Sequence, residues 1–184
     1  MWHWAILLLL IGVPVFFATR SARKRPRPPK DLEGFGGWLM LLAIGQSLSP
    51  LRTLVELSRS VKDYQQLITL PNGPLAVYGE VALTLAFLVL QLVVLVSMLR
   101  RSRHFPKLFI YQWLSIPVLF ILHTVWISRI LGIPIDRLLD VDTLISALIA
   151  VTTTGLWAAY VYRSVRVRNT FGGDTAAAQA ATFS

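Results

Sequence analysis

The amino-acid sequence predicts an all-α integral membrane protein, a four-helix transmembrane bundle preceded by an extra N-terminal transmembrane anchor. The 184 residues are 55% hydrophobic and only 15% charged, whereas average soluble domains carry about 25% charged residues. Five apolar stretches also approach or exceed the roughly 20 helical residues that a bilayer core about 30 Å thick requires. Since unpaired backbone groups are costly in lipid, we expect these stretches to be helices.

The predicted spans follow one another at residues 2–19, 36–58, 75–99, 108–131 and 143–162. The first span is barely long enough, so a cleavable signal peptide is an alternative. Signal peptides carry their positive charge before the apolar run, whereas here the basic residues follow it. We therefore expect an uncleaved anchor at 1–19 and a basic, proline-rich cytoplasmic linker at 20–33. A four-helix domain at 34–171 and a disordered cytoplasmic tail at 172–184 complete the predicted division.

Basic residues gather in alternate gaps between the spans. The gap after span one, the gap after span three and the segment after span five hold thirteen of the eighteen lysines and arginines. The positive-inside rule then predicts five spans with the N-terminus outside and the C-terminus in the cytoplasm. We therefore expect a multi-pass membrane protein.

The basic linker has two interpretations. The first is a topology determinant that contacts anionic lipid headgroups through a cluster of four basic residues, Arg23, Lys24, Arg25 and Arg27. The second is a docking strip for an acidic cytoplasmic protein. A nucleic-acid partner is not expected so close to the bilayer.

Ionisable residues inside a span are expensive in lipid and are therefore candidate functional residues. Arg52 and Glu56 lie near the outer end of the second span, and Glu80 lies at a similar depth in the third. We hypothesise that Arg52 pairs with Glu80 across the two helices, with Glu56 at the outer rim. The pair could merely orient this helical hairpin, or it could line an outward-facing polar pocket for a small ligand or a lipid headgroup.

Other residues in the spans predict kinks and helix contacts. Pro50 and Pro117 each remove an intrahelical hydrogen bond and are expected to kink their helices. Gln91 and Gln112 are expected to form hydrogen bonds between helices, worth roughly 1 kcal/mol each. Small residues recur every fourth position along the fifth span, at Ser146, Ala150, Thr154 and Ala158. Such a stripe allows close helix approach, either within this bundle or against a partner protein or a second copy.

The motifs of common enzymes are missing from the sequence. No nucleotide-binding, zinc-protease or serine-hydrolase motif occurs, and the absence of cysteine excludes thiol nucleophiles and disulfides. We therefore expect no catalytic residues, no metal and no cofactor.

Two segments carry a resemblance to a known family. The first is Gly34-Phe35-Gly36-Gly37-Trp38-Leu39, followed by Ser49-Pro50, and the second is Ser164-Val165-Arg166-Val167-Arg168-Asn169-Thr170-Phe171. Together, over about residues 34–171, they resemble the bacterial membrane proteins of domain of unknown function 2569. Glu80 stands where that family has an acidic residue opening the next helix. The resemblance implies a four-span fold, a location in the bacterial inner membrane as a multi-pass protein, and no activity.

The leading functional expectation is a non-enzymatic accessory or scaffolding subunit that contacts a larger membrane partner. The alternative is a carrier of a small solute or lipid, with its polar pocket near Arg52, Glu56 and Glu80. An unrecognised membrane enzyme is a third possibility.

Overall fold

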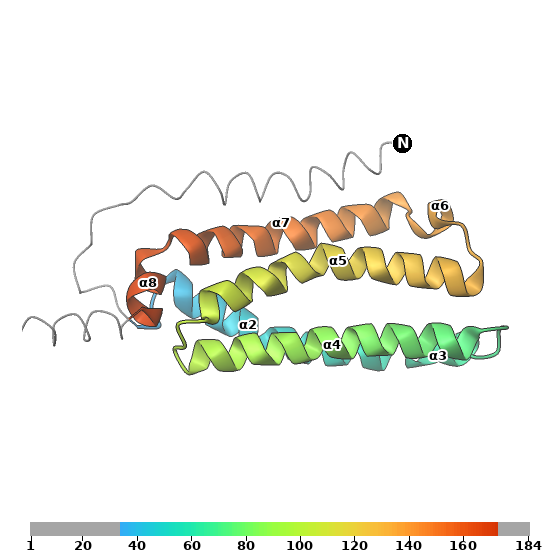
Figure 1. Cartoon of the computed structure of the whole chain (residues 1–184), viewed down its shortest axis with the longest axis horizontal. Helices are drawn as coiled ribbons and strands as arrows, with labels where there is room; N and C mark the ends of the chain where they lie inside the picture. The colour runs from blue at the N-terminus through green and yellow to red at the C-terminus, as the bar shows by residue number, and fades with distance from the viewer. Residues whose placement is uncertain (1–33, 173–184) are drawn as a thin grey trace, which may run out of the picture.

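The computed structural model describes residues 34–172, and within that range it contains helices and no strand (Figure 1). Four long helices run side by side: α2 (Trp38–Arg59), α4 (Gly73–Leu99), α5 (Phe105–Leu131) and α7 (Val141–Arg163). Each is long and apolar enough to cross a membrane. The all-α class and four of the predicted spans are thereby confirmed. The predicted anchor (1–19), the linker (20–33) and residues 173–184 of the tail lie outside the described residues.

Three short helices connect or cap the long ones: α3 (Val61–Leu67), α6 (Ile135–Leu138) and α8 (Val165–Phe171). Local sequence sets the boundaries. Asn72 adopts a left-handed conformation (φ 62°) just before α4, and Pro74 follows in the first turn, where a missing N–H costs no helical bond. Gly132 ends α5 with φ 67°, the left-handed backbone that glycine adopts without penalty. The Asp140 carboxylate caps α7 by accepting a hydrogen bond from the Thr143 N–H, at 2.8 Å.

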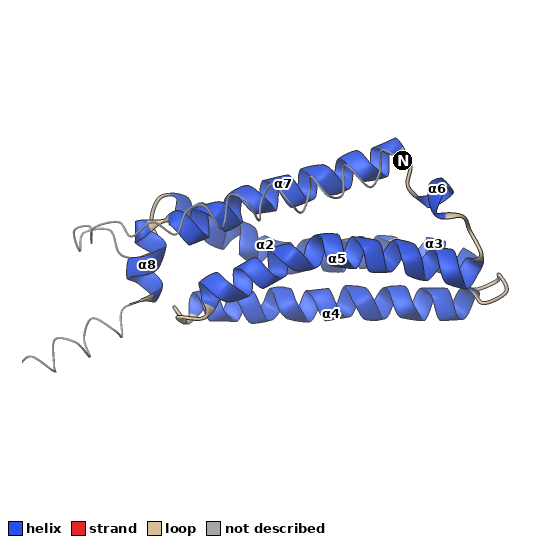
Figure 2. Ribbon diagram, turned by 45° about the horizontal axis from the view of Figure 1, so that its top comes forward, coloured by secondary structure: helices blue, strands red, loops and turns tan. Residues whose placement is uncertain are grey.

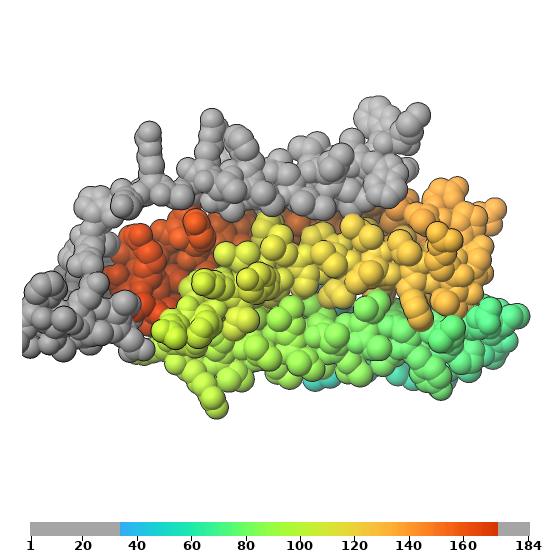
Figure 3. Space-filling view, viewed as in Figure 1, coloured from blue at the N-terminus to red at the C-terminus, as the bar shows by residue number. Residues whose placement is uncertain are grey.

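The long helices pack in chain order. α4 lies against both α2 and α5, and α5 lies against α7, so α4 and α5 form a continuous surface along the molecule (Figure 3). α2 and α7 do not pack along their lengths. They meet where the Trp38 and Trp157 rings contact each other, with centroids 6.2 Å apart, and they separate toward the other end of the bundle (Figure 2).

The tightest packing lies where α8 crosses the end of the bundle (Figure 1). Ser164 is extended and turns the chain between α7 and α8. The largest fully buried side chains gather here, namely Leu39, Val94, Met98, Phe105, Val161 and Val167. We call this end, with the 100–104 loop and α8, the basic end. The opposite end, with α3, the 68–72 turn and α6, is called the α6 end.

Candidate functional site

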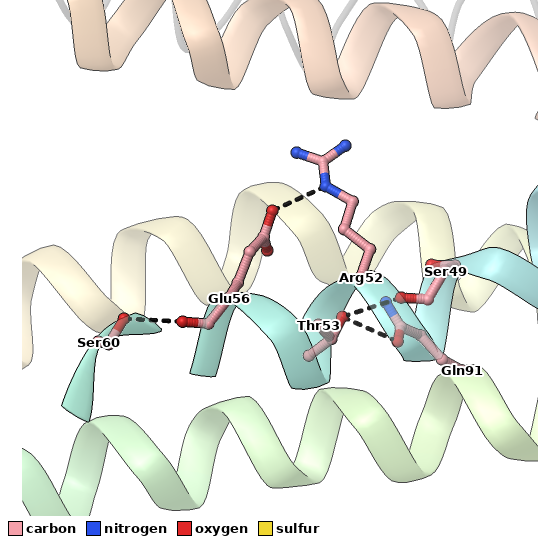
Figure 4. Close-up of polar contacts among 6 residues, drawn as sticks. All are labelled: Ser49, Arg52, Thr53, Glu56, Ser60 and Gln91. Atoms are coloured by element: carbon pink, nitrogen blue, oxygen red, sulfur yellow. Dashed lines mark hydrogen bonds and ion pairs between the residues drawn. The ribbon is translucent and has the colours of Figure 1, made fainter. Parts of the chain in front are cut away.

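Arg52 forms an ion pair on its own helix. Its Nε donates a 2.7 Å hydrogen bond to Oε1 of Glu56, one turn further along α2 (Figure 4). Both side chains are exposed, by 81% and 57% respectively. Figure 4 shows that they point away from α4, toward the side of the bundle on which α7 lies. Arg52 stands seven residues before the end of α2, about 10 Å along the helix axis, so the pair is exposed within a span.

The structure does not bring Arg52 and Glu80 together, and the physical reason is helix rotation. Thr53 faces α4, where its hydroxyl donates a 3.1 Å hydrogen bond to Oε1 of Gln91. Adjacent helical residues are separated by about 100° around the axis, so Arg52 is turned away from α4. Arg52 and Glu80 were predicted to lie at similar depths in their spans, but depth alone does not determine which faces of two helices meet.

Glu80 instead faces α3, where it interacts with the phenol of Tyr64. Glu80 and Gln91 are eleven residues apart, about three helical turns, and therefore share the face of α4 that meets α2 and α3. Burial raises the pKa of the Tyr64 hydroxyl above its ordinary value of 10.0, and the negative charge of Glu80 raises it further, while a hydrogen bond with Ser60 opposes the shift. The interaction of the Glu80 carboxylate with Tyr64 thus connects α4 to α3.

The predicted small-residue stripe on α7 is only partly inside the bundle. Ala158 is buried and Thr154 is half-buried, but Ala150 and Ser146 are exposed. A four-residue step overshoots the 3.6-residue turn by about 40°, so the stripe winds out of the packed face. The buried contacts instead repeat every seven residues, at Leu144, Val151 and Ala158.

The two predicted kink positions flank a buried polar contact. Pro50 and Pro117 are both buried within their helices. Near them, Nε2 of Gln46 donates a 2.8 Å hydrogen bond to Oε1 of Gln112, joining α2 to α5. This bond and the Thr53–Gln91 bond confirm the prediction that Gln112 and Gln91 connect helices. Trp113 adds a third link, since its Nε1 donates to the Val151 carbonyl of α7 at 3.0 Å.

At the basic end, the two segments that carry the family resemblance contact each other. The Gly34 N–H donates a 3.0 Å hydrogen bond to Oγ1 of Thr170, and the Phe35 and Phe171 rings meet edge to face at 6.3 Å. The guanidinium of Arg166 occupies the place where a side chain on Gly36 would begin. The two motifs are far apart in sequence but adjacent in space. Their contacts close the bundle between its first and last described segments.

Sequence reasoning missed a cation–π contact at the same end. The Arg101 guanidinium lies over the Phe35 ring, 5.6 Å from its centroid. Arg101 has φ 50°, an uncommon conformation for a residue with a side chain, in the turn after α4. A basic residue just after a span ordinarily indicates topology alone, and no sequence signal distinguishes Arg101 from its neighbours. The predicted headgroup residues Arg23, Lys24, Arg25 and Arg27 lie outside the described residues.

Residues 34–172 contain no group of three or more His, Cys, Asp or Glu side chains placed to hold a metal ion. The four candidate spans and the polar groups placed among them define a multi-pass α-helical membrane protein. The chain belongs to the family described as protein of unknown function (DUF2569), whose sequence profile matches residues 32–172. Comparisons with curated proteins and with solved structures each found no match.

Proposed function

We propose that this protein is a non-enzymatic accessory or scaffolding subunit of the bacterial inner membrane, which binds a larger membrane protein through α2 and α7. The observation that carries the proposal is the exposed Arg52–Glu56 ion pair within a span. Charged groups facing lipid are costly, and the charges on this pair are not covered by α4, α5 or α7. A partner helix with polar side chains would satisfy them.

The small residues of α7 extend the same argument. Ser146 and Ala150 are exposed, and they stand five and nine residues from the start of α7, about 7–14 Å along its axis. Arg52 is about 10 Å from the same end of α2. Small side chains let another backbone approach closely. At similar depth, α2 therefore offers a charged pair for polar contacts and α7 offers small side chains against which a partner helix can pack closely.

The experiment is to purify the tagged full chain from its native membrane in mild detergent and to quantify the proteins that accompany it. With Ala150→Leu and Ser146→Leu together, the stoichiometric partner should fall by at least about tenfold, since roughly 1.4 kcal/mol of lost contact suffices. Ala86→Leu is the matched control, because Ala86 is an exposed alanine on α4. Equal loss from both variants, or no partner with the native chain, contradicts the proposal.

The carrier hypothesis rests on Arg52, Glu56 and Glu80 lining one pocket. It receives less support, because Arg52 and Glu56 point away from the α4 face that holds Glu80. The two functions separate under Arg52→Gln. A carrier would lose transport while retaining its assembly, whereas an accessory subunit would lose its partner.

The five-span topology, with the N-terminus outside, belongs to the same proposal. Seven basic residues of the described chain and none of its six acidic residues lie at the basic end, which supports a cytoplasmic location for that end. The chain has no cysteine, so single cysteines can be labelled selectively. In intact cells, an impermeant thiol reagent should modify Thr69→Cys at the α6 end and spare Ser102→Cys at the basic end. The reverse pattern contradicts the orientation.

A further inference from the structure

The geometry points to a binding site for the phosphate of an anionic phospholipid at the basic end, formed by the guanidinium groups of Arg101 and Arg166. These residues come from two separate segments of the chain, the turn after α4 and the helix α8. The site is separate from the Arg52–Glu56 region on α2, and it does not depend on the accessory function.

The two guanidinium groups contact two neighbouring residues of the chain, Phe35 and Gly36. Arg101 lies over the ring of Phe35, and Arg166 lies against the backbone of Gly36. Since consecutive Cα atoms are about 3.8 Å apart, both cations are gathered around one short segment. Phe35 is in turn fixed by its ring contact with Phe171. The cations are therefore held by packing, which lowers the entropy that ligand binding would otherwise cost.

Within residues 34–172, no ion pair involves Arg101 or Arg166. The described ion pair is Arg52–Glu56, far away along α2, and no carboxylate among residues 34–172 lies at the basic end. Arg100, Arg103, Lys107 and Arg168 lie at the same end of the bundle. Like charges gathered at one end repel each other and attract an anion. The planar, forked guanidinium matches the oxygens of a phosphate in two parallel hydrogen bonds.

The aromatic residues at this end argue for a lipid as the source of the phosphate. Trp38 at the start of α2 and Tyr162 at the end of α7 are both exposed, as is Tyr111 in the second turn of α5. Exposed tryptophan and tyrosine at the ends of spans are typical of the membrane–water interface. The two arginines thus stand at the depth where phospholipid headgroups lie, next to apolar helix surfaces that acyl chains can cover.

The test is a titration of the purified full chain in detergent with phosphatidylglycerol, followed by native mass spectrometry. Arg101→Gln with Arg166→Gln should weaken binding at least about tenfold, because charge-assisted hydrogen bonds contribute roughly 1.5–3 kcal/mol each. Arg59→Gln with Arg137→Gln removes the same charge at the α6 end and should change binding less than twofold. If both pairs weaken binding equally, net charge explains it and the site is overturned.

Two further measurements test whether the ligand is a lipid and whether binding requires the forked guanidinium group. Phosphatidylcholine should bind at least about tenfold more weakly than phosphatidylglycerol, and excess inorganic phosphate should not displace the lipid; equal binding or full displacement overturns a lipid site. Arg101→Lys keeps the charge but loses the fork, so it should weaken binding severalfold. Since Arg166 also packs against Gly36, Arg166→Gln could impair folding. Arg101→Gln alone, which alters only an exposed side chain, then decides: unchanged binding overturns the site.

Discussion

Gln46 and Gln112 form a buried hydrogen bond of 2.8 Å between α2 and α5, and each stands within five residues of a proline further along its helix, Pro50 and Pro117. A proline at position i leaves the carbonyl of residue i−4 without its helical N–H. For Pro50 that carbonyl belongs to Gln46. The amide pair therefore joins two helices at the level where their backbones are weakened.

Replacing either glutamine by leucine should destabilise the bundle by about 1–3 kcal/mol, because the remaining buried amide loses its partner. The double variant Gln46→Leu/Gln112→Leu should cost less than the sum of the single changes, by roughly 0.5–1.5 kcal/mol. Unfolding in mixed micelles, measured for the four chains of the cycle, gives this coupling directly. Strict additivity would show that the two amides act independently.

The sequence predicted the long helices to within three residues at each boundary. Span three, expected at 75–99, is Gly73–Leu99, and span four, expected at 108–131, is Phe105–Leu131. Apolar length determines such boundaries because lipid excludes unpaired backbone. The direction in which each side chain points around its helix axis was harder to predict. Gln91 and Gln112 were predicted correctly because a buried amide in a span has few partners other than a neighbouring helix, whereas Arg52 pairs with a carboxylate one turn away on α2 and makes no ion pair with α4.

The closure at the basic end could not be predicted from local pattern. Gly34 and Thr170 are separated by 136 positions, and neither hydrophobic periodicity nor capping residues connect them. The motifs indicated a family, but their mutual contact depends on how four helices are packed. Arg101 was similarly hidden among other basic residues of its loop.

Gly79 and Gly45 offer a matched pair of glycine substitutions in spans. A side chain at Gly79 would overlap the Trp126 ring, whereas nothing lies within 4 Å of one at Gly45. Trp126 also donates a 3.2 Å hydrogen bond to the Ala76 carbonyl, which displacement of the ring would break. Gly79→Ala should therefore destabilise by about 1–3 kcal/mol, and Gly45→Ala should be neutral or stabilise by up to about 1 kcal/mol. Thermal unfolding in detergent compares them, and equal midpoints would contradict the α4–α5 contact.

The interaction between Glu80 and Tyr64 predicts a change in titration. Glu80→Gln should lower the pKa of Tyr64 toward its ordinary value of 10.0, because it removes a negative charge that disfavours the phenolate. Asp63→Asn is the control and should lower the Tyr64 pKa less, since Asp63 contributes less than Glu80. Ultraviolet difference spectra against Tyr64→Phe isolate this one phenol. An unchanged Tyr64 pKa in the Glu80→Gln variant would show that the two side chains do not interact.

The same shift has a consequence for stability. The folded pKa of Tyr64 is raised, so the folded chain holds its proton when the unfolded chain has begun to lose it. Its contribution is therefore unaffected below pH 10.0 and turns against the fold as pH rises above that value. Tyr64→Phe should weaken this alkaline loss in a pH series of unfolding midpoints. An identical alkaline loss in the two chains would rule out Tyr64 as its source.

The hydrogen bond from Gly34 to Thr170 also sets a schedule for biosynthesis. A ribosome makes Gly34 first and must add 136 further positions before Thr170 exists. At about 5–20 residues per second, that interval is on the order of ten seconds. During this time α2 is in the membrane without the hydrogen bond between Gly34 and Thr170 that closes the bundle. The first transmembrane helix must therefore avoid non-native contacts with other membrane helices until Thr170 has been synthesised.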